Sequence, residues 1–147
     1  MTDADDQHWL EQALHYARKS KDPSTKVGCV ILRPNGTVAS MGRNGFPRGI
    51  RDDEERLMNR EVKNRMTIHA ELNALHFALE DLTGATLYAT FAPCENCALH
   101  IIQRGIARVV FPDSHVNESW RESQERSLAL LREARVVITP FKLAEAA

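Results

Sequence analysis

The chain has 147 residues, of which 43% are hydrophobic and 27% charged, and its formal net charge is −1. This length suits one ordinary hydrophobic core, so we expect a single domain over residues 1–147. The small net charge argues against broad electrostatic binding of nucleic acid, and no stretch reaches the roughly 20 apolar residues of a membrane span. The acidic start lacks the apolar segment of a secretory signal, so we expect a cytoplasmic protein.

The first half of the chain predicts a helix and then a β-hairpin. Apolar residues recur at helical spacing over residues 7–19, and Asp22-Pro23 ends this pattern. Two strand-like runs follow at residues 26–32 and 37–41, and the Asn35-Gly36 pair between them is a strong turn signal. Residues 43–66 are rich in turn formers and then in charge, which predicts a surface loop leading into an exposed, partly helical stretch.

The second half of the chain alternates strands with helices. We expect helices over residues 68–79, 95–104 and 119–132, and strands over residues 86–90, 108–111 and 135–139. Such alternation after a hairpin indicates a mixed sheet with helices on both faces. The predicted fold class is therefore α/β, a three-layer α/β/α sandwich around a mixed, mainly five-stranded sheet.

Two cysteines stand close together in the segment PCENC, at the start of a predicted helix. The sulfurs of Cys94 and Cys97 lie on one side of its first turn, so they can share a metal ion. A C-x-x-C pair alone is equally typical of a redox pair or of two buried thiols. The odd total of three cysteines does not suggest a disulfide framework, and Cys29, in an apolar strand, is expected in the core.

A histidine and a glutamate in the segment TIHAELNAL favour the metal interpretation. Side chains in the first turn of a helix lean toward its N-terminus, so His69 and Glu71 can meet at one site. Taken separately, a core histidine and a carboxylate favoured by the helix dipole would be ordinary. Together with the cysteines, they suggest one catalytic Zn²⁺ with three protein ligands, His69, Cys94 and Cys97, and an open fourth position. Glu71 would then move protons between water and a leaving group.

The motifs HAE and PCENC together form the H-x-E…P-C-x-x-C signature of zinc nucleobase deaminases. The chain resembles the cytidine and deoxycytidylate deaminase superfamily over about residues 19–142. It is most similar to deoxycytidylate (dCMP) deaminases, through segments such as DPSTKVGCVIL, GRNGFPRG and HAELNAL. The resemblance implies a cytidine deaminase-like fold, hydrolysis of dCMP to dUMP and ammonia, and a homo-oligomer between dimer and hexamer.

Several expected substrate contacts lie outside the two motifs. The resemblance implies that the backbone N–H of Ala70 binds the base and that Asn44 contacts the sugar. Arg43 and Arg48 lie in a glycine-rich loop and can meet a phosphate, although a solvated loop beside the acidic residues 52–55 explains them equally well. His115 is expected to face the substrate near a position where the family often has a tyrosine.

Other functions stay open at this point. The same chemistry can act on cytidine, guanine, a modified pyrimidine nucleotide or a base in tRNA, although the net charge disfavours a polynucleotide. Alternatively, the zinc is structural and the protein is a non-catalytic binding module, in which case Glu71 has no chemical role. Asn73, two positions after Glu71, supports either the site or only its helix.

Overall fold

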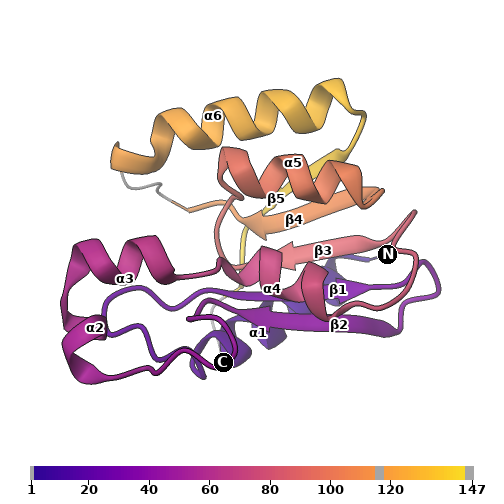
Figure 1. The fold of residues 1–147 in the computed structure, drawn as a ribbon. Coiled ribbons are helices and arrows are strands. Elements are labelled where there is room, and N and C mark those ends of the chain that lie inside the picture. Colours follow the sequence, from indigo (N-terminus) through magenta and orange to yellow (C-terminus); the bar gives the residue numbers. More distant parts are fainter. Residues whose placement is uncertain (1, 115–117, 145–147) are drawn as a thin grey trace.

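The computed structural model describes residues 2–114 and 118–144. Its five strands form one sheet in the order β2-β1-β3-β4-β5, with helices on both faces (Figure 1). The strands are β1 (Gly28–Leu32), β2 (Val38–Arg43), β3 (Thr86–Ala89), β4 (Arg108–Pro112) and β5 (Val137–Phe141). The helices are α1 (Asp3–Ala17), α2 (Glu54–Met58), α3 (Arg60–Met66), α4 (Ala70–Phe77), α5 (Glu95–Gln103) and α6 (Glu118–Glu133).

The sheet is mixed, as predicted. β1 pairs antiparallel with both β2 and β3, whereas β3, β4 and β5 run parallel to one another. The predicted hairpin turn connects β1 to β2, where Gly36 has a φ of 87° and Asn35 Oδ1 accepts a hydrogen bond from the Thr37 N–H. Glycine suits this position because it adopts positive φ without a steric penalty. The edge strand β2 thus lies next to β1, which separates it from the parallel strands β3, β4 and β5.

Side chains of neighbouring strand residues enter two different cores. On one face of the sheet, Val30 and Leu32 pack with Leu10 of α1. On the other face, Cys29 and Ile31 pack in a larger cluster with residues of α4, α5 and α6 (Figure 1). Because both faces are covered, the central strands β1 and β3 are buried at every position. The predicted α/β/α sandwich and the core position of Cys29 are confirmed.

Two predicted helices, α1 and α4, begin more than one residue away from the expected position. α1 starts four residues earlier, because Thr2 and Asp5 form a capping box that satisfies its first backbone N–H groups. α4 starts two residues later than predicted, because the backbone of Ile68 makes an isolated antiparallel bridge to Gly45. His69 consequently lies at the N-cap position of α4 and not inside the helix.

The charged stretch before α4 forms two short helices, as the partly helical prediction required. The side chain of Asp53 caps α2, and that of Asn59 caps α3. One lysine in this stretch is buried, contrary to the expected exposure of the whole segment. Lys63 is 6% exposed and forms an ion pair of 2.9 Å with Asp22. This pair fastens α3 to the segment that precedes β1.

The longest described helix, α6, has 16 residues. A membrane-spanning helix needs roughly 20 predominantly apolar residues. Over residues 2–114 and 118–144, no helix combines the length and the apolar character that a membrane crossing requires. The expected cytoplasmic location stays a prediction.

A buried ion pair attaches α1 to the sheet. Asp6 is 4% exposed and accepts two hydrogen bonds from the Arg108 guanidinium, at 2.7 and 3.1 Å. The Tyr88 hydroxyl donates a third hydrogen bond to Asp6, at 2.7 Å. Burial alone would raise the pKa of Asp6, but these hydrogen bonds hold it below its usual value. The ionised form of Asp6 therefore stabilises the folded state.

Asp6→Asn should lower the free energy of unfolding at pH 7 by about 1.5–3 kcal/mol, because it weakens charged hydrogen bonds. The contribution of Asp6 is complete above its unfolded pKa of about 3.9 and is lost as pH falls through the lower folded pKa. The difference between the two proteins should therefore shrink below about pH 4. Urea unfolding at fixed zinc concentration measures it, with the exposed Asp3→Asn as control. Equal losses for both variants would contradict a special role of Asp6.

Candidate active site

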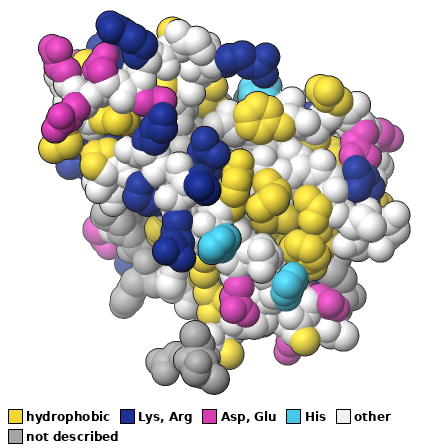
Figure 2. All heavy atoms as spheres, turned by 90° about the horizontal axis from the view of Figure 1, so that it is seen from below, with side chains coloured by type: hydrophobic (Ala, Val, Ile, Leu, Met, Phe, Trp, Pro, Cys, Tyr) yellow, Lys and Arg dark blue, Asp and Glu magenta, His cyan; other side chains and the backbone are white. Residues whose placement is uncertain are grey.

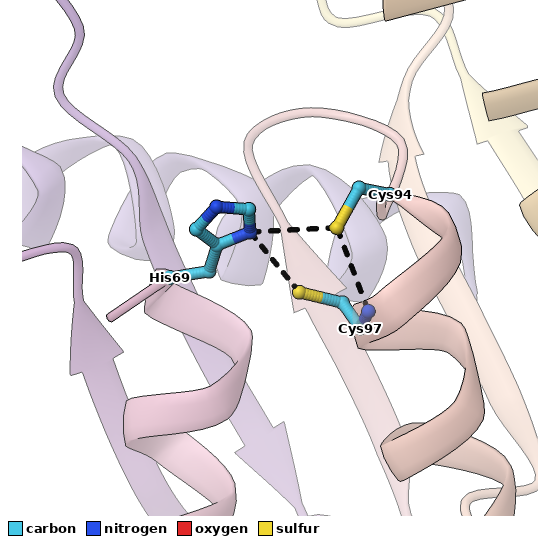
Figure 3. A group of neighbouring side chains, drawn as sticks. All are labelled: His69, Cys94 and Cys97. Carbon is cyan, nitrogen blue, oxygen red and sulfur yellow. Dashed lines mark hydrogen bonds between the residues drawn. The ribbon is translucent and has the colours of Figure 1, made fainter. Parts of the chain in front are cut away.

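The residues of the HAE and PCENC motifs meet where α4 and α5 begin. His69 is the N-cap residue of α4, Cys94 is the N-cap residue of α5, and Cys97 lies in the first turn of α5. The His69 ring points toward both sulfurs (Figure 3), with Nδ1 3.4 Å from Cys94 Sγ and 3.3 Å from Cys97 Sγ. The structure thus brings together the three predicted metal ligands and identifies Nδ1 as the nitrogen that faces the sulfurs.

This donor set fits a tetrahedral metal ion. The three ligand atoms lie within 4.8 Å of one another. Zinc bonds of about 2.0–2.3 Å would place such atoms about 3.6–3.8 Å apart, so only small movements are needed. Within the described part of the chain the group has three members, which leaves one tetrahedral position without a protein ligand. An open position is typical of catalytic zinc sites, whereas structural sites have four protein ligands.

Close packing of α4 on β2 sets the position of the first ligand. A Cβ atom at Gly42 would lie 2.3 Å from the Ala70 carbonyl oxygen and 2.4 Å from the Ala74 backbone nitrogen, so only glycine fits. Ser40, two residues earlier, donates a hydrogen bond of 2.7 Å from Oγ to the Ala74 carbonyl. The first turn of α4, which carries Glu71, is therefore held directly against the backbone of the edge strand.

Side chains of α6 hold the loop that carries the two cysteines. Ser123 Oγ accepts a hydrogen bond of 3.1 Å from the Glu95 N–H, and Gln124 Nε2 donates one of 3.1 Å to the Ala92 carbonyl. Arg126 adds an ion pair of 3.1 Å with the Glu95 carboxylate. These supporting residues are not predicted from the sequence, because they lie about 30 positions from the motif and carry no local signal.

Glu71 lies beside the three ligands but is not one of them. It is 4% exposed, and its Oε2 accepts a hydrogen bond of 3.4 Å from Cys97 Sγ. The group of mutually close ligand atoms does not include its carboxylate. Burial raises the pKa of Glu71 above its ordinary value. A carboxyl group with a raised pKa next to an open metal position is suited to accept and release a proton near neutral pH.

The two cysteines differ in protonation when no metal is bound. The hydrogen bond from Cys97, assisted by His69, lowers the pKa of Cys94 to about 4. The same hydrogen bond and burial raise the pKa of Cys97. The hydrogen bond with Cys94 also raises the pKa of His69. The low pKa favours a thiolate on Cys94, and binding of a metal ion would displace the proton of Cys97.

The structure places two of the predicted substrate contacts close to this group. Ala70 is the first residue of α4, where the backbone N–H has no acceptor within the helix. Asn44 follows β2 directly and is 5% exposed. Its Oδ1 accepts from the Val27 N–H, and its Nδ2 donates to the Thr25 carbonyl, both at 2.9 Å. Within residues 2–114 and 118–144, Nδ2 makes this one donor bond, so its second N–H is available to another acceptor. Both contacts with substrate stay predictions.

Arg43, the last residue of β2, and Arg48, in the loop after β2, are placed differently from one another. Arg43 lies on the α1 side of β2, where its guanidinium donates a 3.3 Å hydrogen bond to the Tyr16 hydroxyl and lies 5.7 Å from the ring centre. This side of β2 is opposite to the one that Gly42 presents to α4, because neighbouring strand residues face opposite sides. The contact of Arg43 with substrate stays a prediction. Arg48 is exposed, and no acidic partner is found for it in residues 2–114 and 118–144. The prediction for His115 lies outside the described residues.

Comparisons with known proteins agree with this geometry. Residues 3–112 match the family described as the cytidine and deoxycytidylate deaminase zinc-binding region. A protein of Aliivibrio fischeri named "Uncharacterized deaminase in luxG 3′ region" is 42% identical over 122 residues, which are 82% of each chain. The deoxycytidylate deaminase of Homo sapiens is 32% identical over 134 residues, 85% of this chain and 71% of the human one.

A solved structure shows the same fold. The dCMP deaminase of cyanophage S-TIM5, in complex with dCMP and dUMP, superposes with a TM-score of 0.80. The match covers 96% of this chain and 99% of the phage chain at 23% identity, so it supports the fold alone. The matched family region includes α4, α5 and all three candidate metal ligands. The chain therefore belongs to the cytidine and deoxycytidylate deaminase family.

Proposed function

We propose that this chain catalyses the zinc-dependent hydrolytic deamination of dCMP to dUMP and ammonia. One observation carries the catalytic part of the proposal: the buried carboxyl group of Glu71 lies beside a three-ligand metal group. A purely structural zinc site would ordinarily have a fourth protein ligand and would not need a buried acid. The non-catalytic interpretation leaves the burial of Glu71 unexplained.

The side chains divide the work of the reaction. His69, Cys94 and Cys97 would hold the zinc ion, which would supply Lewis acidity and make hydroxide available near neutral pH. Glu71 accepts a proton from the attacking water and delivers it to ring N3 as oxygen adds to C4. Glu71 then carries the proton of the hydroxyl group added at C4 to the amino group. The bond between C4 and the amino nitrogen breaks, the C4 carbonyl forms, and ammonia leaves. Water and the cytosine ring thus become uracil and ammonia, and Glu71 returns to its initial state.

A nucleotide substrate is supported by relatives and by the loop after β2. The human relative is named deoxycytidylate deaminase, and the phage dCMP deaminase was solved in complex with dCMP and dUMP. The backbone of Gly45 pairs with that of Ile68, so the loop starts next to the residue that precedes His69. Arg48 lies three residues further along this loop and is suited to bind the phosphate. Asn44 and Ala70 would contact the sugar and the base.

We also propose that the chain works as one deaminase domain within a homo-oligomer. Both hydrophobic clusters pack on the same sheet, which supports a single folding unit. On the side of α1, hydrophobic side chains gather next to a band of Lys and Arg (Figure 2). The exposed apolar residues of α1 and β2 include Leu14 and Val38, which are 40% and 37% exposed. An apolar patch with a polar border is typical of a protein interface.

The metal assignment predicts that, of the three cysteines, only Cys94 and Cys97 determine the zinc content. Cys97→Ser should reduce zinc from about one ion per chain to near zero, because it removes one of three protein ligands. Cys29→Ala is the matched control, since Cys29 is a buried core cysteine that is not a member of the ligand group. Plasma mass spectrometry on dialysed protein measures the metal. Retention of zinc by Cys97→Ser would contradict the proposed site.

The reaction predicts ammonia release from dCMP that depends on Glu71. Glu71→Gln should lower kcat by about 10²–10⁴-fold while zinc remains bound, because it removes the group that moves the proton. The assay compares dCMP with cytidine, guanine and a tRNA anticodon stem. Turnover of one of these three without turnover of dCMP would replace the proposed substrate. Wild-type rates in Glu71→Gln would overturn the mechanism itself.

The phosphate assignment predicts a substrate-dependent effect of Arg48. Arg48→Ala should raise the KM for dCMP about tenfold, because it removes a charged hydrogen bond at an exposed site. It should leave kcat nearly unchanged. The KM for deoxycytidine should not change, because this nucleoside has no phosphate. Arg51→Ala is the control, since Arg51 already lies 3.9 Å from Asp53. Equal effects on dCMP and deoxycytidine would rule out a phosphate contact.

A further inference from the structure

The peptide group between Arg43 and Asn44 lies at the end of the edge strand β2, and its carbonyl group faces the unpaired edge of the sheet. The Asn44 N–H donates to the Val27 carbonyl at 3.3 Å, so it points into the hairpin. In a trans peptide the N–H and the C=O point in opposite directions. The Arg43 carbonyl therefore points away from β1, and β2 has no further strand on that side within the described residues. Such a carbonyl needs another donor to be held in place.

Asn73 of α4 supplies that donor. Its Nδ2 donates a hydrogen bond of 2.8 Å to the Arg43 carbonyl, across 30 positions of sequence. Asparagine is a poorer helix former than alanine, because its side chain competes for backbone hydrogen bonds. Its presence in the middle of α4 is therefore a cost to the helix that this tertiary contact offsets. The bond joins the helix that carries Glu71 to the end of β2.

The peptide bond after Asn44 is held as well. Ser20 Oγ donates a hydrogen bond of 2.9 Å to the Asn44 carbonyl. The Gly45 N–H donates to the Ile68 carbonyl at 3.1 Å, and the Ile68 N–H donates back at 2.8 Å. Both backbone dihedrals of Asn44 are thus determined by neighbours, and one neighbour directly precedes the metal ligand His69. A side chain supported in this way keeps a precise direction.

We propose that Asn73 is a positioning residue, which fixes the Asn44 side chain relative to the metal group and thereby sets the affinity for the nucleotide sugar. This inference rests on the proposed function, because it takes Asn44 as a substrate contact. Asn73 is not a member of the metal-ligand group, and its side chain bonds the Arg43 carbonyl. Its effect passes through the Arg43 carbonyl and the peptide plane that follows it.

The donor role of Asn73 predicts an order among substitutions. Asn73→Ala removes the donor and should raise the KM for dCMP about three- to tenfold, because one neutral hydrogen bond contributes a free energy that corresponds to this ratio. The kcat should stay within about twofold of wild type. Asn73→Asp places a carboxylate against the Arg43 carbonyl and should raise KM further. Asn73→Ser keeps a shorter donor and should lie between wild type and Asn73→Ala. His76→Ala is the matched control, because His76 is exposed on the same helix.

A double variant tests whether the effect passes through Asn44. In an Asn44→Ala background, Asn73→Ala should add less than about twofold to KM, because the side chain that it positions is already absent. Zinc content should be unchanged in every variant. A fall in kcat together with zinc loss, or fully additive effects in the double variant, would show a general structural role and overturn the inference.

Hydrogen exchange gives a readout that does not depend on turnover. Amide exchange of the Asn44 and Gly45 N–H groups should be faster in Asn73→Ala than in wild type and unchanged in His76→Ala. If wild type fails to deaminate dCMP, the proposed function fails, and exchange still tests the positioning role. If wild type is active but Asn73→Ala changes neither KM nor exchange, the inference fails and the proposed function stands.

Discussion

The structure depends on two helices that begin at the same place. The metal ligands are the N-cap residue of α4, the N-cap residue of α5 and a residue in the first turn of α5. Positive ends of two helix dipoles therefore lie together, which favours thiolates and other negative groups between them. The low pKa of Cys94 is consistent with this environment, although its direct cause is the hydrogen bond with Cys97. Any displacement of one helix start would separate the imidazole from the sulfurs.

Each helix start is held by a different neighbour. The glycine backbone of β2 and the Ser40 hydroxyl hold α4, so the histidine side of the site depends on the edge strand. Side chains of α6 hold the PCENC loop through backbone groups of Ala92 and Glu95. The site is therefore built across the whole width of the sheet. A precise geometry at the metal needs such support from residues that do not touch it.

The side of the site that faces the predicted substrate uses a second set of polar contacts. Asn44 is buried, and its side-chain amide bonds the segment before β1. Ser20 donates to the Asn44 carbonyl, and Asn73 donates to the preceding carbonyl, that of Arg43. The Lys63–Asp22 ion pair ties α3 to the same segment. Buried polar groups of this kind are stabilising only when their partners are all present. This requirement explains why the loop after β2 has a defined path although it contains few apolar residues.

The fold class, the order of the elements, the three candidate metal ligands and the role expected of Glu71 could all be predicted from the amino-acid sequence. Apolar periodicity, the Asn-Gly turn and the two short motifs are local properties of the chain, so they can be recognised without coordinates. The folded arrangement was needed to learn which imidazole nitrogen faces the sulfurs, which side of β2 carries Arg43, and which residues support the site. These features come from contacts between residues about 30 positions apart, such as Asn73 with Arg43 and Gln124 with Ala92. A periodic pattern contains no information on such pairs, because packing of separate elements brings them together only in the folded state.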